Sequence, residues 1–207
     1  DLVRSRGLGD VYKRQIMTNI PFIFLALFST LLALGQFRKL FILFMPITLL
    51  PVIFSQVFLS RLSRLTELAD KLKFFRKVFV FTLPVLSLPY LLMWPLGDWL
   101  YHISFNEALD PAHLLMLHLV LATLWITLLK TYFEVLLTSL GANHYKAMLV
   151  TLAVVLTALG YCWFNYSLTV EITAWLFLTG NLLITSMLVV TCLWQIKRQK
   201  TVLPPQL

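Results

Sequence analysis

Six long apolar segments dominate the chain, and they limit its possible folds more than any other feature. Each holds about 20 mostly apolar residues, the length that an α-helix needs to cross the hydrocarbon core of a bilayer. The expected spans are 18–35, 40–59, 78–95, 113–136, 147–164 and 172–194. With 59% hydrophobic and 13% charged residues, the chain has more apolar surface than a soluble globular domain needs. The sequence therefore predicts an all-α polytopic membrane protein.

One long charged segment, residues 61–77 (RLSRLTELADKLKFFRK), interrupts the apolar sequence. Its apolar residues recur at three- and four-residue spacing, so they share one side of a helix, and most of its basic residues lie off that side. These apolar residues are Leu62, Leu65, Leu68, Ala69, Leu72 and Phe75. The pattern predicts a basic helix at the membrane surface, facing anionic headgroups. An ordinary basic loop between two spans is the alternative.

The distribution of Lys and Arg predicts which loops are cytoplasmic. Basic residues are enriched on the cytoplasmic side of membrane proteins, which places residues 61–77 inside. The loops 97–111 and 165–171 hold acidic residues but no Lys or Arg, and this orientation places them outside. Arg38 and Lys39 are an exception, because the same orientation places them outside as well.

The net charge of +8 does not indicate a nucleic-acid partner, because most basic residues lie at the ends of apolar segments. Lys146, in the turn before a span, and the basic tail 197–200 are examples, and both are expected on the cytoplasmic side. Cys162 and Cys192 lie inside expected spans, without a CxxC pair or a nearby His. We interpret them as small apolar side chains and predict no metal site.

The span 113–136 contains a strongly polar set at membrane depth, His118, Lys130 and Glu134. Lys130 and Glu134 are four residues apart, so they share a helix face and can pair. Ionisable groups inside spans are costly and often mark a substrate or proton pathway. We therefore take these three residues, together with Asn181 in the last span, as candidate substrate-binding residues.

Each candidate also has a purely structural interpretation. Lys130 can extend to the membrane interface, and Glu134 can itself be interfacial. His118 can be a neutral residue that hydrogen-bonds a neighbouring helix. Asn181, next to Gly180, can join two helices.

Motifs typical of enzymes are missing from the sequence, which has no glycine-rich phosphate loop, no HExxH and no GxSxG. It also has no segment resembling the selectivity filter of a channel. We therefore expect a protein that is not an enzyme and needs no cofactor. A membrane-embedded transferase of a polymer pathway remains an alternative, for which Asp98, Glu107 and Asp110 would be the acidic cluster.

Residues 1–15 differ from the rest of the chain, because they are polar and aperiodic immediately before a span. The segment 5–15 (SRGLGDVYKRQ) resembles a translated sequencing adapter, since GATGTGTATAAGAGACAG encodes DVYKRQ. This resemblance implies a gene that is truncated at its 5′ end. The expected organisation is a non-native segment 1–15, a six-helix transmembrane lobe 16–200 with a cytoplasmic surface helix 61–77, and a tail 201–207.

The order of these features resembles the second half of a polysaccharide (O-antigen type) flippase of the multidrug/oligosaccharidyl-lipid/polysaccharide exporter superfamily. In that family each half has two spans, a charged cytoplasmic segment and four further spans. The resemblance lies in PVIFSQVFLSRLSRLTE (51–67), FFRKVFVFTLPVLSLPYLL (74–92) and TYFEVLLTSLGANHYKAMLVTLAVVLTALGYCWFNYSL (131–168).

This resemblance implies one lobe of a twelve-helix MATE-like transporter in the bacterial inner (cytoplasmic) membrane, working by alternating access. The implied substrate is a polyprenyl-diphosphate-linked oligosaccharide for surface polysaccharide, including lipopolysaccharide. Lys130 would meet its diphosphate, and Glu134 would tune that contact. The implied partners are the lipid bilayer and the missing N-terminal half of the carrier. A multidrug exporter of the same superfamily is the alternative.

Overall fold

The computed structural model describes residues 19–164 and 168–202, and all regular structure there is α-helical, which confirms the all-α class. The predicted adapter-derived segment 1–15 lies outside the described residues. The helices are a short one at Asn19–Phe28, followed by α2 (Leu31–Leu43), α3 (Met45–Leu62), α4 (Leu68–Phe105), α5 (Pro111–Ser139), α6 (Asn143–Trp163) and α7 (Val170–Val202).

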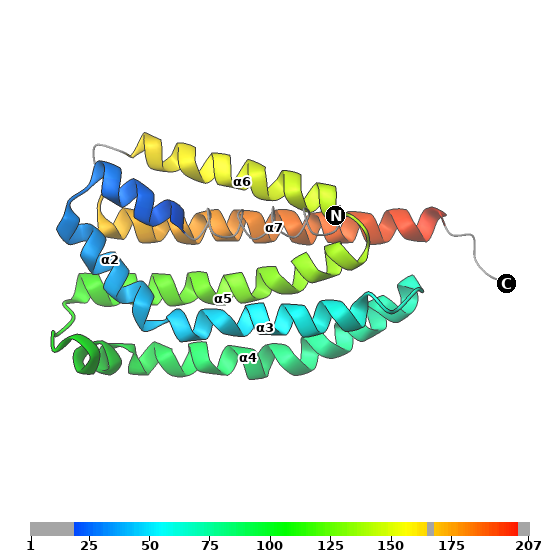
Figure 1. Cartoon of the computed structure of the whole chain (residues 1–207), viewed down its shortest axis with the longest axis horizontal. Helices are drawn as coiled ribbons and strands as arrows, with labels where there is room; N and C mark the ends of the chain where they lie inside the picture. The colour runs from blue at the N-terminus through cyan, green and yellow to red at the C-terminus, as the bar shows by residue number, and fades with distance from the viewer. Residues whose placement is uncertain (1–18, 165–167, 203–207) are drawn as a thin grey trace, which may run out of the picture.

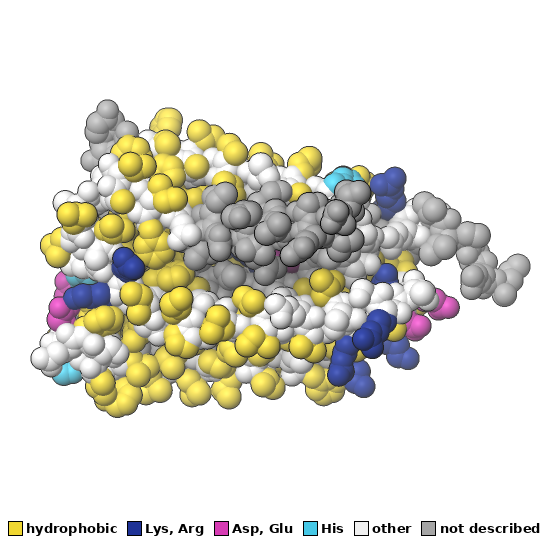
Figure 2. Space-filling model, viewed as in Figure 1, with side chains coloured by type: hydrophobic (Ala, Val, Ile, Leu, Met, Phe, Trp, Pro, Cys, Tyr) yellow, Lys and Arg dark blue, Asp and Glu magenta, His cyan; other side chains and the backbone are white. Residues whose placement is uncertain are grey.

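Five of the described helices, α3 to α7, are long and apolar enough to cross a membrane. Large apolar side chains also cover the outer surface of the bundle, where Phe81 is 68% exposed and Val190 65% (Figure 2). An apolar outer surface is stable against lipid and costly against water. These features indicate a multi-pass membrane protein.

The first expected span, 18–35, is not a single helix. The short helix ends at Phe28, and α2 starts at Leu31 with Thr30 as its N-cap. The Thr30 hydroxyl accepts a hydrogen bond from the Ala33 amide at 3.2 Å, so it satisfies a free N–H at the start of the new helix. Residues 36–39, which separate the first two expected spans, therefore lie inside α2, and neither helical piece is among the five of spanning length.

The expected surface helix 61–77 is divided between two long helices. Helix α3 ends at Leu62, and α4 begins at Leu68 and continues to Phe105 without a break. The predicted apolar side is largely present, because Leu65, Leu68, Leu72 and Phe75 pack against the core, while Lys73 is exposed and Lys71 half-buried. The apolar side therefore packs against other helices and not against a membrane surface. From Leu68 on, it belongs to the first turns of α4, a helix of spanning length.

Helix α4 has 38 residues, or about 57 Å at 1.5 Å per residue, which exceeds a hydrocarbon core of about 30 Å. Its length lets one helix carry both a basic start and an apolar span. Much of the expected loop 97–111 is also helical, since the connection to α5 is only 106–110.

Helix α5 lies at the centre of the bundle and packs against α3, α4, α6 and α7 (Figure 1). The α3–α4 turn, the α5–α6 turn and the end of α7 share one end of the bundle, which we call the basic end (Figure 1). The α4–α5 loop lies at the opposite end, which we call the acidic end. The predicted basic and acidic loops are therefore separated along the bundle.

A proline in α3 leaves a backbone carbonyl that a neighbouring helix satisfies. Pro51 has no N–H, so the Ile47 carbonyl four residues earlier lacks its usual intrahelical donor. The hydroxyl of Tyr90 on α4 donates to that carbonyl at 3.4 Å. Both Pro51 and Tyr90 are buried, so this bond joins α3 to α4 where water cannot replace it.

Candidate substrate cavity

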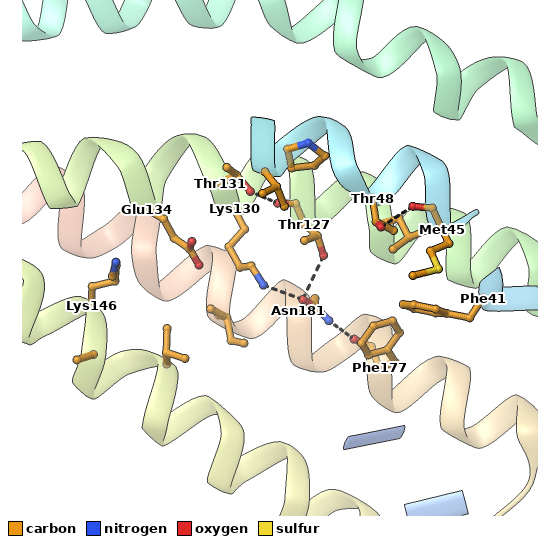
Figure 3. Close-up of a pocket in the computed structure, with 16 residues that line it drawn as sticks. Phe41, Met45, Thr48, Thr127, Lys130, Thr131, Glu134, Lys146, Phe177 and Asn181 are labelled. Atoms are coloured by element: carbon orange, nitrogen blue, oxygen red, sulfur yellow. Dashed lines mark hydrogen bonds between the residues drawn. The ribbon is translucent and has the colours of Figure 1, made fainter. Parts of the chain in front are cut away.

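A cavity of about 300 Å³ lies within the bundle, lined by side chains from α2, α3, α5, α6 and α7 (Figure 3). Lys130, Glu134 and Lys146 lie toward one side of it, and Phe41, Met45 and Phe177 toward the other (Figure 3). The remaining polar lining is Thr48, Thr127, Thr131 and Asn181. The cavity therefore has one charged side and one apolar side.

Lys130 on α5 reaches Asn181 on α7. The Lys130 ammonium donates to the Asn181 side-chain oxygen at 3.2 Å, and the Thr127 hydroxyl lies 3.4 Å from the same oxygen. The Asn181 amide nitrogen donates to the Phe177 carbonyl at 2.9 Å, which fixes which way the amide points. Asn181 is thus a lining residue of the cavity and also a contact between two helices.

Glu134 follows Lys130 by one helical turn, so the two share a helix face, and both line the cavity. Only 6% of Glu134 is exposed. A carboxylate so enclosed is costly unless polar or cationic groups surround it. The lysines from α5 and α6 bring positive charge into the same cavity.

Lys146 belongs to this cavity, although the sequence suggested only a cytoplasmic turn. Its helix, α6, starts at Asn143, so Lys146 already lies in the first turn and is only 8% exposed. Its ammonium donates to the Thr138 hydroxyl on α5 at 3.4 Å. A lone lysine just ahead of an apolar run is the sequence signal that could have suggested this position.

The turn before α6 has the geometry that brings Lys146 back against α5. Gly141 has φ of +75°, a left-handed conformation that glycine adopts without a steric penalty. The Ala142 amide bonds the Leu137 carbonyl and the Gly141 amide bonds the Thr138 carbonyl, both at 3.1 Å. This pair of bonds is a Schellman motif, which ends α5 and reverses the chain.

His118 does not line the cavity. Its ring stacks on Trp94 of α4 with centroids 4.4 Å apart, and its Nε2 lies 3.2 Å from the Trp94 carbonyl oxygen. These contacts join α4 to α5, in agreement with the structural interpretation of a histidine that bonds a neighbouring helix.

The acidic residues of the α4–α5 loop are used in local contacts. Both Glu107 carboxylate oxygens lie 2.7 Å from the Lys39 ammonium. Their hydrogen bond raises the pKa of Lys39 and lowers that of Glu107. Asp110 caps α5 by accepting from the His113 amide at 2.8 Å. Lys39, an exception to the expected charge distribution, is therefore neutralised by an acid at the same end.

Among the described residues, no group of three or more His, Cys, Asp and Glu side chains could hold a metal ion. Cys162 is exposed, and Cys192 is buried with its thiol 3.5 Å from the Phe133 carbonyl oxygen. The two thiols are therefore separate: Cys162 faces outward, and Cys192 is packed between helices.

The chain matches no protein-family model, no curated protein and no solved structure. Its class therefore follows from its own fold and cavity. It is a helical membrane protein with several spanning-length helices, and these helices help to enclose a cavity lined by two lysines and one glutamate.

Proposed function

We propose that the chain is one lobe of a MATE-like transporter that exports a lipid-linked oligosaccharide across the bacterial inner membrane during surface polysaccharide synthesis. The observation that carries this proposal is the cavity inside the apolar bundle, which has charged side chains on one side. Lys130 is nine residues from the end of α5, or about 14 Å along the helix. A lysine inside a helix of spanning length often marks a substrate or ion pathway.

The charge of the cavity favours an anionic substrate group. Two lysines face one glutamate, and the low dielectric around them strengthens their attraction for an anion. A diphosphate offers several oxygens to ammonium donors. Asn181, which already accepts from Lys130, holds that ammonium at the cavity wall.

The opposite wall suits the apolar part of such a substrate. Phe41, Met45 and Phe177 border the cavity away from the charged side chains (Figure 3). A polyprenyl diphosphate combines a charged headgroup with an apolar chain. A volume of about 300 Å³ is at the small end for ligand sites, so it would hold a headgroup only. The rest of the substrate would need space between this lobe and the second lobe of the proposed transporter.

Complementation in bacteria tests this proposal. The complete gene containing this sequence is expressed in a strain that lacks its own O-antigen flippase, and surface polysaccharide is measured. Replacing Lys130 with Ala should lower export about tenfold, because a charge-assisted contact with the substrate is lost. Lys130→Arg keeps the positive charge and should retain more activity.

The matched control is Lys73→Gln, which removes one exposed positive charge from α4 outside the cavity. It should leave export unchanged at equal protein abundance. Normal surface polysaccharide after deletion of the gene, together with increased drug sensitivity, would instead favour a multidrug exporter. A transferase activity that requires Asp98, Glu107 and Asp110 would contradict the transport proposal.

A further inference from the structure

A second cavity, of about 590 Å³, lies at the basic end and is separate from the candidate substrate cavity. Side chains from the α3–α4 turn, the start of α4, the α5–α6 turn and the end of α7 line it. Its polar lining includes Thr66, Lys71, Ser139, Gln195, Arg198 and Gln199. None of these residues lines the first cavity.

The side chains around this cavity mainly present hydrogen-bond donors. Lys71 donates to the Ser139 carbonyl at 2.8 Å, and Gln199 donates to the Leu140 carbonyl at 3.3 Å. These bonds satisfy carbonyls at the end of α5 and hold both side chains at the cavity wall. An ammonium has three N–H donors, so Lys71 keeps two for another acceptor.

Gln195 adds a neutral donor from α7. Only 6% of this residue is exposed, and no side-chain hydrogen bond is found for it among the described residues. Because Gln195 lines the cavity, a molecule bound there can reach its amide. A bound acceptor would give this amide N–H a hydrogen-bond partner inside the cavity.

The charges at the cavity select for an anion. Lys71 and Arg198 both line it, while the nearest acids in sequence, Glu67 and Asp70, are exposed and do not. Dark-blue Lys and Arg side chains also gather at this end of the molecule (Figure 2). Guanidinium, ammonium and amide donors together match the several oxygens of a phosphate.

Neighbouring aromatic residues favour a position of the cavity near the lipid headgroups. The Arg198 guanidinium lies 5.6 Å from the ring centre of Trp194, which packs edge-on against Tyr145. Trp and Tyr are enriched at membrane interfaces, and basic pockets between helices on the cytoplasmic side can bind phospholipid headgroups. Leu193, beside Trp194, is 62% exposed and offers an apolar surface for acyl chains.

We propose that this second cavity binds the phosphate of an anionic phospholipid. Lys71, Arg198 and the Gln195 amide hold the headgroup, and its acyl chains lie along the outer surface of α7.

Native mass spectrometry of the full chain in detergent tests this proposal, with phosphatidylglycerol or phosphatidylcholine added stepwise. Phosphatidylglycerol should bind preferentially, and Arg198→Gln should weaken that binding about tenfold through loss of a charge-assisted contact. Gln195→Leu leaves the net charge unchanged and should also weaken it. Lys73→Gln should change binding by less than about twofold, because Lys73 does not line the cavity and would reach the headgroup only through solvent.

Equal binding of the two lipids would overturn the proposal. So would an equal loss of binding in Lys73→Gln and Arg198→Gln, since this would indicate diffuse attraction to the whole basic end. In a separate experiment, inorganic phosphate is added as a competitor. If it displaces phosphatidylglycerol at equal concentration, the cavity is a site for free phosphate instead. Circular dichroism confirms that each variant keeps its helices, and Arg198, an exposed residue, is the variant least expected to disturb folding.

Discussion

At the scale of single residues, Gly180 lets α6 and α7 approach each other closely. A Cβ atom at this position would lie 2.7 Å from the Thr157 hydroxyl oxygen and 3.2 Å from its methyl group. Thr157 is 9% exposed, and its hydroxyl has no hydrogen-bond partner in the described part of the chain. Steric fit, and not a hydrogen bond, therefore determines this contact.

Gly180→Ala should lower the stability of the bundle by about 1–3 kcal/mol, because overpacking forces the helices apart. Thermal unfolding in detergent measures the change. Adding Thr157→Ala should restore most of the loss by removing both clashing atoms. Gly35→Ala is the matched control, since nothing lies within 4 Å of a Cβ there. An equal loss in both single variants would contradict a local clash.

At the scale of helices, α3 and α4 are joined where Tyr90 bonds the carbonyl that Pro51 leaves free. Tyr90→Phe should cost about 1 kcal/mol, because the Ile47 carbonyl then lacks a donor in an apolar environment. In a Pro51→Ala background the new amide satisfies that carbonyl within α3, so the same substitution should cost less. Thermal unfolding of the original protein, the two single variants and the double variant measures the coupling free energy between Tyr90 and Pro51. Equal costs in both backgrounds would show that the two residues act independently.

The Lys39–Glu107 pair links α2 to the α4–α5 loop, and its contribution should depend on pH. The pKa of Glu107 is lowered from 4.5, so the pair is fully present above that value and is lost as pH falls through the lowered pKa. Stability should therefore decrease in acid, and Glu107→Gln should reduce this dependence. Thermal unfolding across this pH range is the measurement, and an unchanged pH profile in the variant would contradict the link. The effect is small, because both side chains are partly exposed to solvent.

Hydropathy predicts the helices α5, α6 and α7 closely, because each apolar run is bounded by polar turns. It misses the break before α2, because this break lies inside an apolar run, where the Thr30 N-cap of α2 is a weak sequence signal. It also misses the continuity of α4, since periodicity at 61–77 gives the face of a helix but not the residue at which that helix ends.

The cavity was only partly predictable. The four-residue spacing of Lys130 and Glu134 indicates a shared face. The contact between Lys130 and Asn181 joins residues 51 apart, and no local pattern in one sequence gives such a pairing. Lys146 was missed because a charge at the end of a span is typical of a membrane boundary.

At the scale of the whole molecule, the separation of the basic and acidic ends makes the predicted orientation testable. Arg64 and Ala108 are exposed at opposite ends of the bundle. In a variant without Cys162 and Cys192, Ala108→Cys should react with a membrane-impermeant maleimide on intact cells. Arg64→Cys should react only after lysis. Labelling of Arg64→Cys in intact cells would contradict the predicted orientation and, with it, the proposed direction of export.

The hydrogen bond between Lys130 and Asn181 has a further consequence for the proposed transporter. An anion that attracts the Lys130 ammonium competes with the Asn181 oxygen for the same donor. Binding of the substrate would then weaken this hydrogen bond between α5 and α7, and re-forming the bond would favour substrate release. In the proposed transporter, binding of the anion and the α5–α7 hydrogen bond would thus be thermodynamically linked.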